Sequence, residues 1–183
     1  MGQLRDLIIA QPRANLYAVA DAASLPGLLE PMYAPGRRSF ACLLPGEISA
    51  DVAHVAPYLI ALHGAPALVD WLDARLALPW GYVVQADAGL LALQLHLRRF
   101  TETRGPNGEE WLFRFWDPRV LRTMPDILTP AQTAEFMAGI ARIYLPGPGA
   151  GSALHADWDA GSQRLRFAGR AAASEQGVAH AYV

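Results

Sequence analysis

The sequence contains no lysine, and all 15 of its basic residues are arginine. A chain without lysine cannot form a Walker A phosphate site, a Schiff base or a Ser-x-x-Lys nucleophile pair. Its single cysteine, Cys42, excludes a disulfide within the chain, so we expect a cytosolic compartment. Cys42 stands in an apolar run, residues 40–44, which predicts a core residue rather than a reactive thiol.

Charge is also scarce. Charged residues make up 17% of the chain, against about 25% in typical domains. The formal net charge of −2 gives no electrostatic basis for binding nucleic acid or an anionic membrane. No apolar run reaches the roughly 20 residues that span a bilayer, and the N-terminus lacks the apolar segment of a signal peptide. We therefore expect a soluble cytoplasmic protein.

Signatures of metal and cofactor sites are missing as well. No two histidines have the His-x-x-x-His spacing that places two imidazoles on one helix face, and no Gly-x-Ser-x-Gly motif occurs. The alternating glycines of residues 147–151 follow a predicted helix and include a proline, which indicates a linker rather than a phosphate loop. We therefore expect no metal, no cofactor and no catalytic residues. The five histidines are His54, His63, His96, His155 and His180.

Apolar runs and amphipathic segments alternate along the chain. Residues 16–20, 40–44, 55–62 and 81–84 have the pattern of buried strands, and amphipathic helices are expected to begin at Pro66, after Asp87 and at Thr129. The helix from Thr129 should carry Ile140 and Ile143 on its apolar face. This order predicts an α/β (α+β) fold: a mixed sheet with flanking helices, a central β-hairpin and a helical C-terminal part.

The predicted domain covers residues 1–145. Residues 146–183 are expected to be a linker and a C-terminal tail, with a small hairpin formed by residues 154–158 and 164–167 and a disordered end.

The most specific local pattern lies in residues 98–121. Residues 100–104 alternate as a strand does, and Asn107-Gly108 favours a tight turn. The aromatic run of residues 111–116 suits a second strand. Asp117-Pro118 then has the form of an N-cap followed by the first helical residue. The stretch predicts a hairpin followed directly by a helix.

A group of charged residues surrounds this hairpin: Arg98, Arg99, Arg114, Asp117 and Arg119. Arg114 lies in an aromatic strand with one face expected to be buried, and a buried guanidinium must be paired. An Arg114–Asp117 or Arg119–Asp117 ion pair would join the hairpin to the next helix. Alternatively, these arginines bind carboxylates or carbonyl oxygens of a partner protein. Both roles remain open from the sequence.

An ordered set of sequence blocks resembles the effector-chaperone (adaptor) family of bacterial type VI secretion, known as domain of unknown function 4123. The resemblance extends from about residue 16 to residue 144. Its blocks are residues 16–23, 42–47, 55–59, 80–81 and 96–100, and the most specific is Leu112-Phe113-Arg114-Phe115-Trp116-Asp117-Pro118-Arg119-Val120-Leu121.

The resemblance implies a non-enzymatic cytoplasmic adaptor for toxin delivery. Such a protein binds the N-terminal region of a secreted effector and loads it onto the valine-glycine-repeat spike protein. Binding would use strand addition at a sheet edge or a helix in an apolar groove. The alternative is a small α/β hydrolase or ligand-binding domain that uses Asp21, Glu47 and a histidine, because acids at strand ends are common in α/β enzymes.

Overall fold

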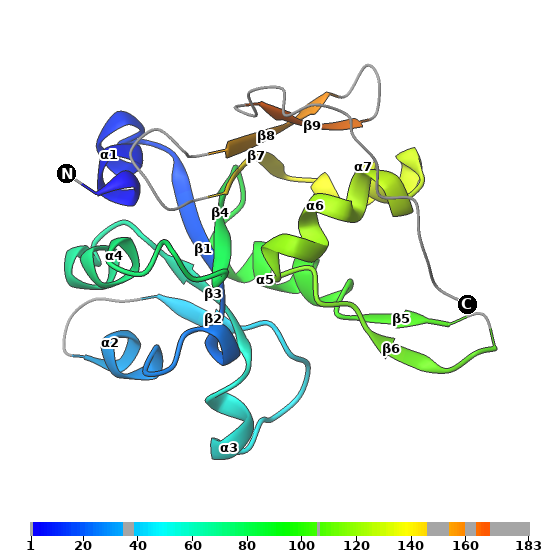
Figure 1. Cartoon of the computed structure of the whole chain (residues 1–183), viewed down its shortest axis with the longest axis horizontal. Coiled ribbons are helices and arrows are strands. Elements are labelled where there is room, and N and C mark those ends of the chain that lie inside the picture. Colours follow the sequence, from blue (N-terminus) through cyan, green and yellow to red (C-terminus); the bar gives the residue numbers. More distant parts are fainter. Residues whose placement is uncertain (1, 35–38, 106, 146–153, 160–163, 169–183) are drawn as a thin grey trace.

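The computed structural model describes residues 2–34, 39–105, 107–145, 154–159 and 164–168. Within these residues, seven strands form one sheet in the order β2-β3-β1-β4-β7-β8-β9 (Figure 1). Every strand pair in this sheet is antiparallel. The strands are β1 (Asn15–Asp21), β2 (Phe40–Cys42), β3 (Pro57–Ala61), β4 (Gly81–Ala86), β7 (Ile140–Leu145), β8 (Leu154–Asp159) and β9 (Arg164–Ala168).

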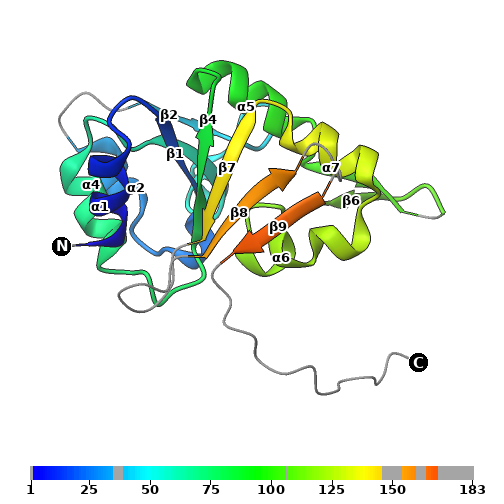
Figure 2. The same ribbon diagram turned by 90° about the horizontal axis from the view of Figure 1, so that it is seen from above.

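Helices cover both faces of the sheet (Figures 1 and 2). One face carries α1 (Gln3–Ala10), α2 (Leu29–Tyr33) and α4 (Pro66–Asp73). The other carries α5 (Leu90–Arg98), α6 (Pro118–Ile127) and α7 (Pro130–Met137). A 3₁₀ turn, η1 (Ala22–Ser24), and the short α3 (Ala50–Ala53) lie in connections. The predicted α+β fold with flanking helices is confirmed, although the sheet is not mixed in strand direction.

Strand alternation produces two separate cores. In β1, Leu16, Ala18 and Ala20 contact the layer of α1, α2 and α4. Tyr17 and Val19 contact the layer of α5, α6 and α7. Successive residues of a strand point to opposite faces, so a central strand that is apolar throughout must be covered on both sides. β1 is such a strand, with all residues after Asn15 buried.

The predicted hairpin and the helix after it are present, but the second strand ends at Leu112 rather than at residue 116, so Arg114 lies after the strand and not in it. β5 (Glu102–Arg104) pairs with β6 (Glu110–Leu112), and Gly108 in the turn has φ of +88°. Asp117 caps α6, which begins at Pro118. Thr129 and Gln132 form the capping box of α7. The turn, the cap and the capping box each form between residues that are only a few positions apart in the chain.

The helical C-terminal part was predicted incorrectly in one respect. α7 ends at Met137, and Ile140 and Ile143 belong to strand β7. Gly139 has φ of +78°, a conformation that favours glycine and ends the helix. The β-branched isoleucines after it then suit a strand. β8 and β9, in the segment expected to be a tail, continue the same sheet from β7. The predicted linker and disordered end lie outside the described residues.

Helix α1 has no counterpart in the sequence-based expectations. Its first N–H groups are capped from a distance: Asp73 of α4 accepts from Leu4 N at 2.9 Å and from Arg5 N at 3.3 Å. Arg5 also binds Asp70 through both Nε and Nη2. α4 therefore holds α1 in place by polar bonds as well as by the buried side chain of Leu4.

In the part of the chain that the structure describes, no helix is long and apolar enough to cross a membrane.

Candidate functional site

Asp21, at the end of the central strand β1, is almost fully buried and forms an ion pair. Its carboxylate accepts from Ala23 N and from Ser24 Oγ, each at 3.1 Å, and so caps η1. Arg114 Nη2 donates to Asp21 Oδ2 at 2.8 Å. The Asp21 side chain is 2% exposed, whereas that of Arg114 is 46% exposed. The arginine therefore bridges the interior and the surface.

A second ion pair stands at the N-terminus of α6. Asp117 accepts from Arg119 N at 2.8 Å, from its Nε at 3.0 Å and from its Nη2 at 2.7 Å. These side-chain bonds from Arg119 are the main reason that the pKa of Asp117 is lowered from its ordinary value. The same bonds raise the pKa of Arg119. The Asp117 side chain is 8% exposed and that of Arg119 is 71% exposed.

The two pairs form one group of charges, the strand-end cluster of Asp21, Arg114, Asp117 and Arg119. Arg114 contributes to the lowered pKa of Asp117, and Asp21 contributes to the raised pKa of Arg119. Two buried carboxylates thus hold two guanidinium groups whose outer parts face solvent. A carboxylate with a lowered pKa stays ionised at neutral pH, so Asp117 is suited to holding Arg119 rather than to donating a proton.

The sequence grouped Arg98 and Arg99 with these residues, but the structure places their contacts elsewhere. Arg98 Nη2 donates to the carbonyl oxygen of Leu44 at 2.6 Å, and its buried Nε has no hydrogen-bond partner among the described residues. Arg99 forms an ion pair with Glu135 of α7. Arg98 thus holds the segment after β2 against α5, and Arg99 links α5 to α7.

Of the two predicted ion pairs, Arg119–Asp117 is present. Arg114 uses Asp21 instead, a residue 93 positions away in the chain. The sequence does not identify Asp21 as the partner of an arginine. The buried end of an apolar strand was a usable signal, because a carboxylate there needs a cationic partner.

The residues of the alternative enzyme do not line the two cavities that we describe below. Glu47 is exposed, and Asp21 is bonded to Arg114, Ser24 and Ala23. His96 Nε2 lies 2.9 Å from the carbonyl oxygen of Phe136, between α5 and α7. Among the described residues, no three His, Cys, Asp or Glu side chains are grouped so as to hold a metal ion.

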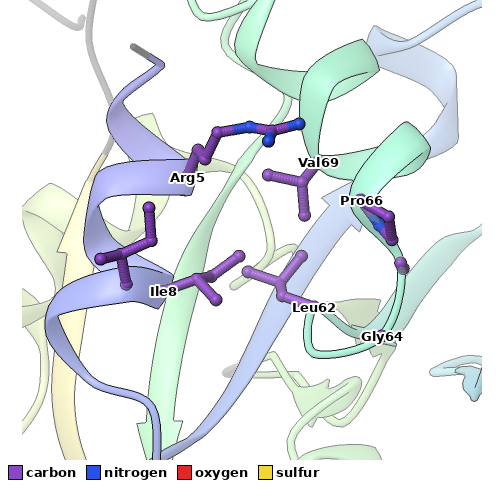
Figure 3. A pocket seen from close by; sticks show the side chains of 8 residues that line it. Arg5, Ile8, Leu62, Gly64, Pro66 and Val69 are labelled. Carbon is purple, nitrogen blue, oxygen red and sulfur yellow. The ribbon is translucent and has the colours of Figure 1, made fainter.

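One cavity, of about 200 Å³, lies between α1 and α4 (Figure 3). The side chains of Ile8, Leu62 and Val69 point toward one another across it, while Arg5 lies at its edge and extends toward α4. The full lining is Arg5, Ile8, Ile9, Leu62, Gly64, Ala65, Pro66 and Val69. This largely apolar cavity lies on the opposite side of the sheet from α5, α6 and α7.

A second cavity, of about 230 Å³, lies at the root of the β5–β6 hairpin. Helix α7 contributes Gln132, Glu135 and Phe136, and strand β5 contributes Glu102 and Thr103. The remaining lining residues are Arg99, Phe100, Phe113 and Leu128. Phe136 is buried, whereas Phe100, Phe113 and Leu128 are half-buried. The lining therefore combines aromatic and aliphatic side chains with a polar edge.

Large apolar side chains are exposed on the α5 side of the molecule. Leu91 and Leu95, one turn apart on α5, are 67% and 55% exposed, and Trp111 and Leu112 of β6 are 51% and 55% exposed. Exposed aromatic and arginine side chains are frequent anchors of protein interfaces.

Comparison with known proteins identifies one family. The model of a family described as Domain of unknown function (DUF4123) matches residues 16–135. This range includes the whole strand-end cluster, the hairpin and most of α7. No curated protein matches the chain, and no solved structure matches it.

Proposed function

Because the chain belongs to the DUF4123 family, which is associated with type VI secretion effector chaperones and adaptors, we propose that it is a non-enzymatic adaptor. In this role it binds a secreted effector in the bacterial cytoplasm and loads it onto the spike protein. The family match over residues 16–135 is the observation that carries the proposal.

Features of the described surface support a role in binding. Arg114 and Arg119 present guanidinium groups to solvent while buried carboxylates hold their positions. A guanidinium held in this way loses less side-chain entropy when it binds a partner. We propose that Arg114 and Arg119 contact the effector or the spike. Asp21 and Asp117 position them, and Arg98 and Arg99 support the fold around α5.

A co-purification experiment tests the proposal. The tagged chain is expressed together with the proteins encoded beside it, and the eluted proteins are identified. We expect a large effector that is unstable alone, together with a spike protein. If the chain elutes alone and its neighbours fold without it, the adaptor function is wrong.

A matched pair of variants tests the role of the strand-end cluster. Arg119→Gln removes an exposed guanidinium from the cluster, and Arg122→Gln removes one from the next turn of the same helix, outside the cluster. We expect only Arg119→Gln to reduce the amount of co-purified partner. Arg119→Gln also removes the side-chain partner of the buried Asp117 carboxylate, so binding is compared well below the melting temperature of both variants, where each chain is folded. Equal binding by both variants would show that the cluster supports the fold alone.

A further inference from the structure

The β5–β6 hairpin extends away from the sheet and the helices (Figures 1 and 2). All three residues of each strand are exposed. A two-stranded hairpin in water is marginally stable at best, and a third strand stabilises it. The hairpin therefore has the most to gain, of the described strands, from pairing with another segment.

The register determines which backbone groups of the hairpin are unpaired. Thr103 lies opposite Trp111, and the rungs two residues to either side of this one are hydrogen-bonded, through Phe113 N to Thr101 O and through Gly105 N to Glu109 O. In an antiparallel pair, bonded and non-bonded rungs alternate. The N–H and C=O groups of Glu102 and Arg104 therefore point outward along the free edge of β5. Those of Glu110 and Leu112 point outward along β6.

The edge of the main sheet at β2 is less accessible. The same alternation places the Cys42 carbonyl on the outer edge of β2, and Gln94 Nε2 of α5 donates to it at 2.8 Å. Arg98 donates to the carbonyl oxygen of Leu44, two residues further along the chain. Side chains of α5 thus occupy acceptors that an added strand would need.

A cavity adjoins the β5 edge and not the β6 edge. Glu102 and Thr103 of β5 line the 230 Å³ cavity described above, and no residue of β6 does. A cavity of roughly 150 Å³ holds benzene, so this one has room for an aromatic or branched aliphatic side chain. The edge offers main-chain hydrogen bonds to an added strand, and the cavity selects which side chain that strand can carry. Strand-addition sites combine these two features.

Trp111 extends the same apolar face beyond the cavity. By strand alternation it shares a face with Phe113 and lies opposite Thr103. A Cβ atom at Gly105 would lie 2.8 Å from Cζ2 of its indole, so the ring covers the glycine. Trp111 is thereby held over the residue that follows β5, with half of its surface still exposed.

The hairpin is acidic. Between residues 102 and 112 the chain carries Glu102, Glu109 and Glu110 against a single arginine, Arg104. A basic segment complements this charge, and complementary charge speeds encounter and fixes register.

We propose that the free edge of β5 takes an extended, basic segment of a partner polypeptide as a third strand, with one apolar side chain of that segment in the adjoining cavity. This inference rests on the proposed function, since the segment belongs to a protein that the adaptor binds. The added strand pairs with Glu102 and Arg104, and Trp111 shields the new rungs from water.

Two proline variants on one rung test the proposal. Arg104→Pro removes an outward N–H from the β5 edge, and Glu110→Pro removes one from the β6 edge directly opposite. Neither residue donates a bond within the hairpin, and proline is tolerated at such edge positions. We expect Arg104→Pro to weaken partner binding by about tenfold and Glu110→Pro to leave it near that of its charge control. Arg104→Gln and Glu110→Gln measure the charge change alone.

Hydrogen exchange provides a direct readout on the wild-type chain. The probes are overlapping synthetic peptides that cover the co-purified partner. We expect a bound peptide to slow exchange of the Glu102 and Arg104 amides and to leave Glu110 and Leu112 unchanged. Unprotected Glu102 and Arg104 amides in the complex would overturn the proposal. So would protection that rises with the concentration of the chain alone, because that indicates a second copy as the occupant.

Co-purification with the wild type and with Arg104→Pro separates the adaptor function from strand addition. If no partner co-purifies with the wild type, the adaptor function is wrong and strand addition is wrong with it. If a partner co-purifies equally with the wild type and with Arg104→Pro, the adaptor function stands and only strand addition is wrong.

Discussion

At Asp21 and Arg114, the two members of one ion pair differ greatly in their access to water. The carboxylate is 2% exposed and the guanidinium side chain is 46% exposed. Removing a buried charge's partner leaves that charge without compensation, whereas a half-exposed guanidinium regains water when its partner is lost. Replacing one member is therefore not equivalent to replacing the other.

We predict that Arg114→Met destabilises the fold more than Asp21→Asn does. Arg114→Met leaves the Asp21 carboxylate buried and should lower the free energy of unfolding by about 3 kcal/mol. Asp21→Asn keeps an oxygen for the Ala23 N–H and should cost about 1 kcal/mol. Urea denaturation measures both, with the exposed Arg122→Met as the control. The reverse order would contradict the assignment of Asp21 as the buried member.

A second prediction concerns pH. Because the pKa of Asp117 is lowered in the folded chain, the contribution of its ionised form is present above the unfolded pKa of about 3.9 and is lost as pH falls through the folded pKa. Arg119 stays protonated throughout this range and adds no slope. Asp117→Asn keeps a good N-cap without the titrating charge.

The free energy of unfolding should therefore be higher for the wild type than for Asp117→Asn at neutral pH. This difference should shrink as the pH falls below about 4. Urea denaturation at several acid pH values measures it. A difference that stays constant across the acid range would show that the Asp117–Arg119 pair adds nothing to folding.

At the scale of elements, α1 depends on a cap that another helix supplies. Asp73 of α4 accepts from the first N–H groups of α1, so we predict that Asp73→Ala lowers the free energy of unfolding by about 1 to 2 kcal/mol. It should also speed hydrogen exchange in α1. Asp6→Ala, an exposed change within α1 itself, is the control and should have little effect. Equal exchange rates in both variants would contradict the capping role.

Local signals made several elements predictable. Asp117-Pro118 and the Thr129–Gln132 capping box act within three residues, and the structure contains both. The cap of α1 and the partner of Arg114 are 69 and 93 positions away, so no local pattern could identify them. The end of α7 was harder to predict for another reason: the apolar residues that continue past Gly139 suit a helix and a strand equally well. The backbone at that glycine decides between them.

At the scale of the whole molecule, the sheet extends past the residues that match the family model. β8 and β9 continue from β7, and Ala156 and Leu165 are buried in the core beneath α5, α6 and α7. We predict that a chain ending at Leu145 loses at least about 2 kcal/mol of stability, since burying one leucine alone contributes about that much. The urea midpoint measures the loss. An unchanged midpoint would show that residues 1–145 fold as an independent domain, as the sequence predicts.

Because β1 is a central strand, its pairing must wait until the strands on both sides of it have been synthesised. β1 pairs with β3 and β4, and the β4 residues that face it are made about 60 to 70 residues later. At roughly 5–20 residues per second, an apolar strand thus waits several seconds on the ribosome before its second neighbour exists. A protein proposed to shelter another chain is itself exposed to aggregation early in its own production, and slower elongation lengthens that interval.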